Sequence, residues 1–199
     1  MEKVFINPIT FREDGFALGA QMLDDGFEAD FLLILLRGGA EIGCFVDEYL
    51  GYFGVNTGLI FMRTSSYDDI DKTSGNVIIS DVGDLIKDLK STSKVAIIDD
   101  IFDTGLSIEA VLNFLQESLK ENCPKDIRIA TVDYKPTRNL TKRVPNYYVN
   151  AVKEWLVYPH ELKGLTIDEI RQGMGSKIAN LIETTMNNRN LMNSTNSEK

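Results

Sequence analysis

The chain of 199 residues is long enough for one substantial hydrophobic core and short for two full domains. Hydrophobic residues make up 43% of the chain and charged residues 26%, values that are ordinary for a globular protein. The net charge of −9 disfavours nucleic acid and anionic membranes as partners, because both need clustered Lys and Arg. The first residues lack a signal pattern and no apolar run reaches the length of a membrane span, so we expect a cytoplasmic protein.

Cysteine and histidine are scarce. Cys44 and Cys123 lie far apart without the spacing of metal ligands, so we expect reduced thiols. The single histidine, His160, nearly excludes a Ser-His-Asp or Cys-His nucleophilic site and a multi-histidine metal site. Acid–base chemistry must therefore come from carboxylates, lysine or tyrosine.

The periodicity of apolar residues and the positions of turn residues predict alternating strands and helices. In chain order we expect a helix over 11–25, a strand over 31–36, a helix over 40–50, strands over 59–62, 77–79 and 95–98, a helix over 108–119, strands over 127–132 and 144–149, and a helix over 167–186. A continuous apolar run such as residues 31–36 is typical of a parallel strand that is covered on both faces. The sequence therefore predicts an α/β protein with a central parallel sheet flanked by helices.

Two further signals concern the first helix. Thr10 or Asp14 is expected to cap its start. Gly26 is expected to end it, because glycine tolerates the left-handed conformation that is common just after a helix. Before the helix, residues 1–10 are expected to be extended.

The last part of the chain differs in character from the rest. Thr166 and Glu169 have the spacing of a capping box at the start of a helix. Gly173 and Gly175 each weaken that helix by about 1 kcal/mol relative to alanine, so a break near them is expected. We expect the helix to pack on the core or on a second subunit. Residues 187–199 are rich in Asn and Ser, which predicts a disordered tail.

Residues 95–107 are the most informative stretch. The apolar strand over 95–98 runs into Asp99 and Asp100, and a loop of small residues over 103–107 then leads into a helix. The N–H groups of such a loop and the positive end of the helix dipole point at the same spot, which suits a phosphate group. The acid pair can accept hydrogen bonds from sugar hydroxyls or hold a hydrated divalent cation. A loop in an unrelated α/β protein is the alternative.

A second strand-to-helix loop consists of Arg37, Gly38 and Gly39. The two glycines allow the backbone to come close to an anion, and Arg37 adds a fixed positive charge with bidentate donors. Because parallel strands end at the same edge of a sheet, both loops are expected to converge on one ligand there. A plain tight turn is the alternative.

The stretch from Asp99 to Ser107 closely resembles the 5-phosphoribosyl-1-pyrophosphate (PRPP) motif of the type I phosphoribosyltransferases. In that family an apolar strand is followed by two acids, two apolar residues, Asp-Thr-Gly, any residue, and Thr or Ser, and every position is matched. The loop over 37–39 resembles the Arg-Gly-Gly pyrophosphate loop of bacterial xanthine–guanine and archaeal purine enzymes. The resemblance spans residues 10–161. It implies the family's Rossmann-like sheet with a small hood, and the exchange of PRPP and a base for a nucleoside monophosphate and pyrophosphate.

The resemblance also implies site residues. Those expected to bind PRPP are Arg37, Gly38, Gly39, Ser66, Tyr67, Asp99, Asp100, Asp103, Thr104, Gly105, Leu106 and Ser107. Ser66 and Tyr67 belong to a polar loop that resembles the family's mobile lid over the site, although a solvated loop is the alternative. Asp99 and Asp100 are expected to face the ribose hydroxyls and to help hold Mg²⁺. Asp103 is the candidate catalytic group, because the family's acid at this position handles the proton on purine N7.

A basic residue that contacts pyrophosphate in some relatives is missing near the strand over 77–79, where Ser80 and Asp81 stand instead.

The base-binding residues implied by the resemblance are Lys135, Trp155 and Leu156. Lys135 precedes a proline at a strand end, as does the lysine that hydrogen-bonds purine O6 in relatives acting on 6-oxopurines. Trp155 matches the aromatic residue that stacks on the base, and Leu156 the residue that completes the pocket. His160 and Leu156 replace the tryptophan and isoleucine that are usual in the family. A surface lysine and a core tryptophan are the alternative readings.

The sequence thus resembles a purine phosphoribosyltransferase that transfers phosphoribosyl from PRPP to hypoxanthine, guanine or xanthine with Mg²⁺. Relatives form dimers or tetramers, so we expect a homodimer or a homotetramer. Residues 1–186 would form one domain, with a hood from the N-terminal segment and about 135–165 and a C-terminal helix over 166–186. The alternatives are a PRPP-binding regulator without catalysis, and the same chemistry on a pyrimidine.

Overall fold

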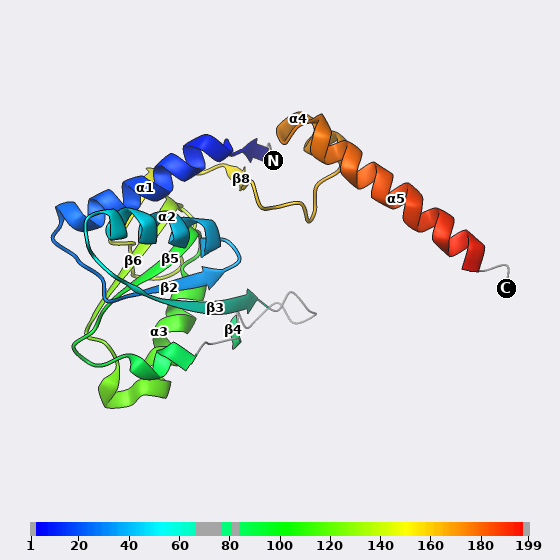
Figure 1. Ribbon diagram of the computed structural model, residues 1–199. Coiled ribbons are helices and arrows are strands. Elements are labelled where there is room, and N and C mark those ends of the chain that lie inside the picture. The colour runs from blue at the N-terminus through cyan, green and yellow to red at the C-terminus, as the bar shows by residue number, and fades with distance from the viewer. Residues whose placement is uncertain (1–2, 67–76, 81–83, 197–199) are drawn as a thin grey trace. The chain divides into compact units, whose positions relative to one another are not determined.

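The computed structural model describes residues 3–66, 77–80 and 84–196 (Figure 1). These residues fall into two compact units, a larger one over Ile9–Lys153 and a smaller one that combines Met1–Pro8 with Glu154–Lys199. Each unit has its own sheet. The predicted division of the chain into one domain with a hood stays a prediction, and the local structure within each unit, including the predicted tail, is reported below.

The larger unit alternates strands and helices. It contains most of α1 (Pro8–Asp24), then β2 (Phe31–Leu36), α2 (Gly39–Tyr52), β3 (Gly58–Ser66), β4 (Val77–Ser80), the short 3-10 helix η1 (Asp84–Asp88), β5 (Lys94–Phe102), α3 (Leu106–Leu119), η2 (Lys120–Asn122), β6 (Asp126–Tyr134) and β7 (Tyr147–Ala151). The six strands form one sheet in the order β4-β3-β2-β5-β6-β7. Five strands are parallel, and β4 runs antiparallel to β3 at one edge. This confirms the predicted parallel α/β sheet.

Helices cover both faces of this sheet, with α1 and α2 on one face and α3 on the other (Figure 1). Side chains alternate along β2, so that Ile34 packs against Gly43 of α2. Leu33 points to the opposite face and joins Ile97 of β5 and Val111 of α3 in the main hydrophobic cluster. Burial on both faces explains why β2 is a continuous apolar run.

The first helix begins earlier than predicted, at Pro8 rather than at residue 11. A proline in the first turn costs nothing in hydrogen bonds, because an N–H group there has no partner within the helix. Thr10 and Asp14 therefore lie inside α1 and do not cap it, and the carboxylate of Asp14 accepts a hydrogen bond from Asn150. Gly26 follows the helix with a φ of 70°, which confirms the predicted end.

Strand boundaries also differ from the prediction, and β3, expected over 59–62, continues to Ser66. The strand that carries the acid pair does not stop before Asp99 but continues to Phe102, because β6 pairs with it as far as Tyr134. The strand expected over 144–149 begins only at Tyr147. Pro145 has no N–H to donate, and the side chain of Asn146 accepts a hydrogen bond from the Ile129 N–H at 2.9 Å in place of a ladder carbonyl.

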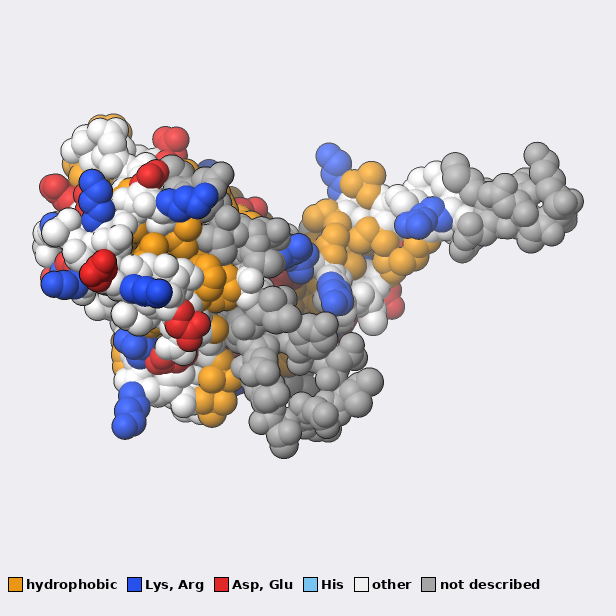
Figure 2. Space-filling model, turned by 90° about the horizontal axis from the view of Figure 1, so that it is seen from below, with side chains coloured by type: hydrophobic (Ala, Val, Ile, Leu, Met, Phe, Trp, Pro, Cys, Tyr) orange, Lys and Arg blue, Asp and Glu red, His pale blue; other side chains and the backbone are white. Residues whose placement is uncertain are grey.

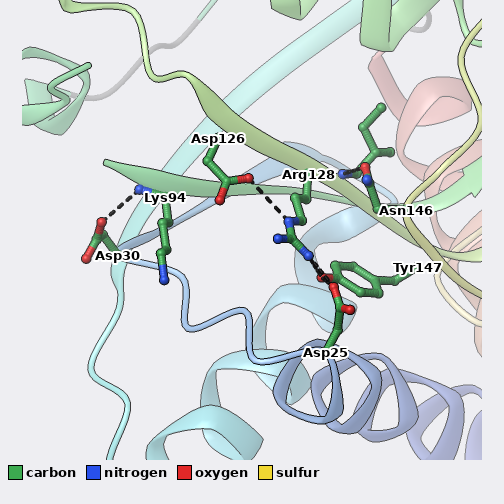
Figure 3. A network of polar contacts seen from close by, with 8 residues as sticks. Asp25, Asp30, Lys94, Asp126, Arg128, Asn146 and Tyr147 are labelled. Atoms are coloured by element: carbon green, nitrogen blue, oxygen red, sulfur yellow. Dashed lines mark hydrogen bonds and ion pairs between the residues drawn. The ribbon is translucent and has the colours of Figure 1, made fainter. Parts of the chain in front are cut away.

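Polar contacts tie together the amino ends of the strands, at the edge of the sheet opposite the acid pair (Figure 3). The guanidinium of Arg128 lies 4.3 Å from the ring centroid of Phe27 and forms ion pairs with Asp25 and Asp126. The Tyr147 hydroxyl donates a hydrogen bond to Asp25 at 2.9 Å. Burial and this hydrogen bond raise the pKa of Tyr147 to about 12, and the hydrogen bonds from Tyr147 and Arg128 lower the pKa of Asp25.

The smaller unit contains β1 (Lys3–Phe5), β8 (Trp155–Val157), α4 (Ile167–Gly173) and α5 (Ser176–Asn196). The two strands pair in parallel, and Lys3 forms an ion pair of 2.8 Å with Glu169 of α4. The capping box of Thr166 and Glu169 is confirmed. The break between α4 and α5 also lies near the predicted position, at Gly175, whose φ is 100°.

The C-terminal helix is longer than predicted. It continues to Asn196, so most of the segment that we expected to be a disordered tail is helical. Hydrophobic side chains gather on the surface of α4 and the nearby part of α5 in Figure 2. Of the side chains on α5, Leu181 is 62% and Met186 52% exposed. Packing of this helix on a second subunit stays a prediction. Among the described residues, no helix combines the length and the apolar character needed to cross a membrane.

Candidate functional site

The carboxyl ends of three neighbouring strands bring the predicted site residues of the larger unit together. The loop over 37–39 follows β2, the stretch over 99–107 completes β5 and opens α3, and Lys135 follows β6. Since β2 pairs with β5 and β5 with β6, these segments lie side by side at one edge of the sheet. This is the edge at which open parallel sheets bind ligands.

The glycines of the first loop allow close contact with the acid pair. A Cβ atom on Gly38 would overlap the carboxyl group of Asp100, and one on Gly39 would overlap the backbone carbonyl of Ile98. The peptide bond between Leu36 and Arg37 is cis. The close approach of the two glycines shows that the loop packs directly on β5, and the Gly39 N–H donates to the Asp99 carboxylate.

The two carboxylates are crowded and largely removed from water. Asp100 is only 8% exposed, and its N–H donates a hydrogen bond of 3.0 Å to Oδ1 of Asp99. Burial, followed by the neighbouring charge of Asp100, raises the pKa of Asp99 well above its usual range. The Gly39 N–H donates to the same carboxylate and partly offsets this effect. Two desolvated carboxylates side by side are a favourable place for a cation or for hydroxyl donors.

The loop before α3 has the conformation expected of a phosphate site. Gly105 has a φ of 80° and occupies the N-cap position, where it has no side chain with which to cap the helix. The Leu106 N–H makes a long hydrogen bond of 3.4 Å to Oγ1 of Thr104, and the positive end of the helix otherwise suits an anion. A Cβ atom on Gly105 would lie 2.7 Å from the ring of Phe102 and 2.8 Å from Oγ1 of Thr141, so only glycine fits. Thr104 and Ser107 add hydroxyl groups on either side of this glycine.

Asp103 and Lys135 meet beside this loop. Lys135 is 5% exposed, and its Nζ lies 3.7 Å from Oδ2 of Asp103. The Nε of Arg138 lies 2.8 Å from the other oxygen, Oδ1. That oxygen is shielded from solvent and, within the described part of the chain, accepts no hydrogen bond of acceptable geometry despite this short distance. The site thus contains a carboxylate oxygen that can still accept a hydrogen bond, next to a buried ammonium group.

Comparison with known proteins shows the family. A family model described as "Phosphoribosyl transferase domain" matches residues 14–162. The chain belongs to this family.

Solved phosphoribosyltransferases have the same fold. The purine phosphoribosyltransferase from Pyrococcus horikoshii Ot3 is 28% identical with a TM-score of 0.65, and the match covers 83% of this chain and 98% of that one. The xanthine-guanine-hypoxanthine phosphoribosyltransferase of Helicobacter pylori is 21% identical with a TM-score of 0.62 over 79% of this chain and 92% of that one. A hypoxanthine phosphoribosyltransferase from Staphylococcus aureus is 23% identical with a TM-score of 0.58 over 71% and 72%.

The sequence analysis did not identify two basic residues that lie near the candidate site of this phosphoribosyltransferase. Arg138 contacts Asp103, as described above, and the only sequence signal was a charge three positions after Lys135. Arg63 of β3 is in register with Leu36, the residue just before the loop over 37–39, and with Ser80 of β4 on its other side. A second arginine therefore lies in the strand next to the expected pyrophosphate loop, and it pairs with Ser80, near which the sequence lacks the basic residue of some relatives.

Some predicted residues of the phosphoribosyltransferase site are not brought together by the described structure. Ser66 ends β3, but its side chain and the whole of Tyr67 lie outside the described residues. Trp155 and Leu156 belong to β8 in the smaller unit, where Trp155 is 50% exposed and Leu156 is buried. A role for these four residues in binding PRPP or a base stays a prediction.

Proposed function

We propose that this phosphoribosyltransferase transfers the 5-phosphoribosyl group of PRPP to a 6-oxopurine, giving a nucleoside monophosphate and pyrophosphate. The observation that supports this best is the buried ammonium of Lys135 beside the carboxylate of Asp103. A 6-oxopurine carries the acceptor O6 next to position N7 on one edge of the ring. Lys135 can donate to O6 while Asp103 accepts a proton at N7, and adenine would instead present an amino group to the ammonium.

The remaining groups suit PRPP. The ribose 5-phosphate would bind the N–H groups and hydroxyls of residues 103–107 at the positive end of α3. Arg37 and the N–H groups of Gly38 and Gly39 would hold the pyrophosphate, with Arg63 in the neighbouring strand. The Gly39 N–H would then exchange the Asp99 carboxylate for an oxygen of the ligand. Asp99 and Asp100 would accept hydrogen bonds from the 2′ and 3′ hydroxyls.

The acid pair also fits Mg²⁺. This ion prefers octahedral oxygen ligands and is commonly held by one or two carboxylates together with waters and substrate phosphates. Asp99 and Asp100 supply two such carboxylates beside the expected pyrophosphate loop. When bound, Mg²⁺ neutralises negative charge on pyrophosphate and makes it a better leaving group.

The reaction breaks the bond between C1′ of the ribose and the pyrophosphate oxygen and forms a bond from C1′ to a ring nitrogen of the base. Positive charge develops on the ribose, as in other glycosyl transfers. The carboxylates of Asp99 and Asp100 would stabilise that charge. The base loses one proton, and Oδ1 of Asp103 would receive it. Arg138, which approaches the same oxygen, would move aside for the base to bind.

Release of pyrophosphate tests the proposal directly. The protein is mixed with PRPP, Mg²⁺ and one base from adenine, hypoxanthine, guanine, xanthine and uracil. We expect turnover with at least one 6-oxopurine and little with adenine or uracil. Turnover with uracil alone would instead indicate a pyrimidine enzyme, and tight PRPP binding without turnover would indicate a regulator.

A pair of variants tests the role of Asp103. Asp103→Asn keeps the shape of the side chain but cannot accept the proton, so we expect turnover to fall by at least about 100-fold, the lower range for general acid–base catalysis. Asp88→Asn removes an exposed carboxylate on η1 and serves as the matched control. Full activity of Asp103→Asn would refute the assigned role. Light scattering on the same samples tests the expected homodimer or homotetramer.

A further inference from the structure

The segment that follows β6 forms a wall against the phosphate loop. The N–H of Leu140 donates a hydrogen bond of 3.0 Å to the carbonyl of Thr104. Next to it, Oγ1 of Thr141 closes the space beside Gly105, where a Cβ atom would lie only 2.8 Å away. Two consecutive residues of this segment thus fix the backbone of two consecutive residues of the phosphate loop.

Apolar packing does not explain the position of this wall. Leu140 is 71% exposed, and its neighbours Arg138 and Lys142 are exposed as well. A short surface segment without buried anchors takes its shape from local hydrogen bonds between side chains and backbone. Ion pairs of Arg138 with Asp103 and of Arg143 with Glu109 attach the segment near its two ends. The shape of the turn between these ion pairs therefore depends on the residue that supplies the local hydrogen bonds.

Asn139 makes most of these hydrogen bonds. Its Oδ1 accepts from the Thr141 N–H at 2.8 Å and from the Thr141 hydroxyl at 2.9 Å. Its Nδ2 donates to the carbonyl of Arg143 at 2.7 Å and to the hydroxyl of Tyr134 at 3.2 Å. The half-buried side chain of Asn139 thereby closes the turn between Asn139 and Arg143 and attaches this turn to Tyr134 at the end of β6.

Asn139 is also connected to Lys135, the lysine expected to contact the base. The Asn139 N–H donates to the carbonyl of Lys135 at 3.2 Å, and the Lys135 N–H donates to the carbonyl of Phe102 at 2.9 Å. Phe102 is the last residue of β5, directly before Asp103. The backbone hydrogen bonds therefore join the lysine expected to contact the base with the loop expected to hold the phosphate.

We propose that Asn139 is a positioning residue for the 5-phosphate subsite of PRPP. It touches no substrate, and it acts by holding Leu140 and Thr141 against the Thr104–Gly105 backbone, so that the N–H groups of the loop keep one arrangement. The inference rests on the proposed function. If Asn139 serves the fold alone, its loss lowers stability without changing phosphate affinity, which is the outcome that separates the two roles.

Three variants distinguish these roles. Asn139→Ala removes all four side-chain hydrogen bonds. Thr141→Val keeps the shape of the side chain and removes the hydroxyl that faces Gly105 and Asn139. Asn146→Ala is the matched control, because it deletes a side-chain hydrogen bond to the backbone in the same stretch of chain, at Ile129, far from the phosphate loop.

The readouts are the KM for PRPP, the KM for the purine, the thermal midpoint and the affinity for ribose 5-phosphate from calorimetry. We expect Asn139→Ala to weaken ribose 5-phosphate binding and to raise the KM for PRPP roughly tenfold, equivalent to about 1.4 kcal/mol. Thr141→Val should shift both in the same direction by a smaller factor. The KM for the purine should change less than twofold, and Asn146→Ala should leave both constants unchanged.

Equal ribose 5-phosphate affinities in Asn139→Ala, Thr141→Val and Asn146→Ala would overturn the inference, whatever their thermal midpoints. If Asn139→Ala does not fold, the ribose 5-phosphate affinity of Thr141→Val is compared with that of Asn146→Ala, and equal values overturn the inference. A wild-type protein that binds ribose 5-phosphate but shows no turnover refutes the proposed transfer and leaves the affinity comparison to decide on Asn139. A wild-type protein that does not bind ribose 5-phosphate overturns both.

Discussion

The contact between Gly39 and β5 makes a strong prediction about a single methyl group. In Gly39→Ala the new Cβ would overlap the backbone carbonyl of Ile98 and lie 3.2 Å from Cα of Asp99, so the clash is with backbone atoms in the centre of the sheet. Overpacking in such a place typically costs about 1–3 kcal/mol, and the higher helix propensity of alanine returns less than about 1 kcal/mol of it. We expect the free energy of unfolding to fall by about 1–2 kcal/mol.

Urea unfolding measures this loss. With a slope of about 2 kcal/mol per molar urea, the midpoint should fall by roughly 0.5–1 M. Gly51→Ala is the matched control, because Gly51 lies at the other end of α2 and a Cβ atom there meets nothing within 4 Å. That variant should be as stable as the wild type or more stable by up to about 1 kcal/mol. The KM for pyrophosphate in the reverse reaction should rise in Gly39→Ala alone. Equal midpoints and equal constants in the two variants would refute the close packing of this loop on the acid pair.

Three further predictions concern recognition of the base and the polar cluster around Tyr147, at the edge of the sheet opposite the candidate site. Lys135→Met should raise the KM for the purine at least about tenfold and leave the KM for PRPP nearly unchanged, since a hydrogen bond to a charged group is worth about 1.5–3 kcal/mol; a parallel rise in both constants would argue against O6 recognition. Trp155→Ala should likewise raise the KM for the base far more than that for PRPP, and an unchanged base KM would remove Trp155 from the pocket. The pKa of Tyr147 is raised from 10.0 to about 12 in the folded protein, so its contribution to stability is complete below pH 10 and is lost as the pH rises toward 12. The stability difference between the wild type and Tyr147→Phe in urea unfolding should therefore shrink over that range, and a constant difference would contradict the assignment.

Much of the larger unit could be predicted from local sequence patterns. The continuous apolar runs at residues 31–36 and 95–98 indicate strands buried on both faces, and both lie in the centre of the sheet. Gly26 has the positive φ that the predicted helix end requires. These features depend on residues close together in the chain, which is why the sequence alone reveals them.

Element ends were predicted less well, because pairing and packing decide them. β5 continues through the acid pair because β6 offers hydrogen-bond partners along its whole length. β7 starts late because Pro145 cannot donate and Asn146 satisfies a backbone N–H of β6 with its side chain. The helix over the last residues contradicts a prediction that relied on composition, since Asn and Ser disfavour helix only weakly.

For the candidate site, too, the sequence alone predicts some features and only the tertiary structure shows the others. The residue types of the phosphate loop, the acid pair and the Arg-Gly-Gly loop follow from the sequence alone, because each chemical role needs neighbouring residues in a fixed order. Only the tertiary structure brings the ammonium of Lys135 to 3.7 Å from Asp103 and places Arg63 in register with Leu36. It also places Leu140, in the wall that Asn139 holds, within hydrogen-bond distance of Thr104. These contacts join residues on different strands and loops, and no local pattern encodes a distance between groups that only the folded sheet brings together.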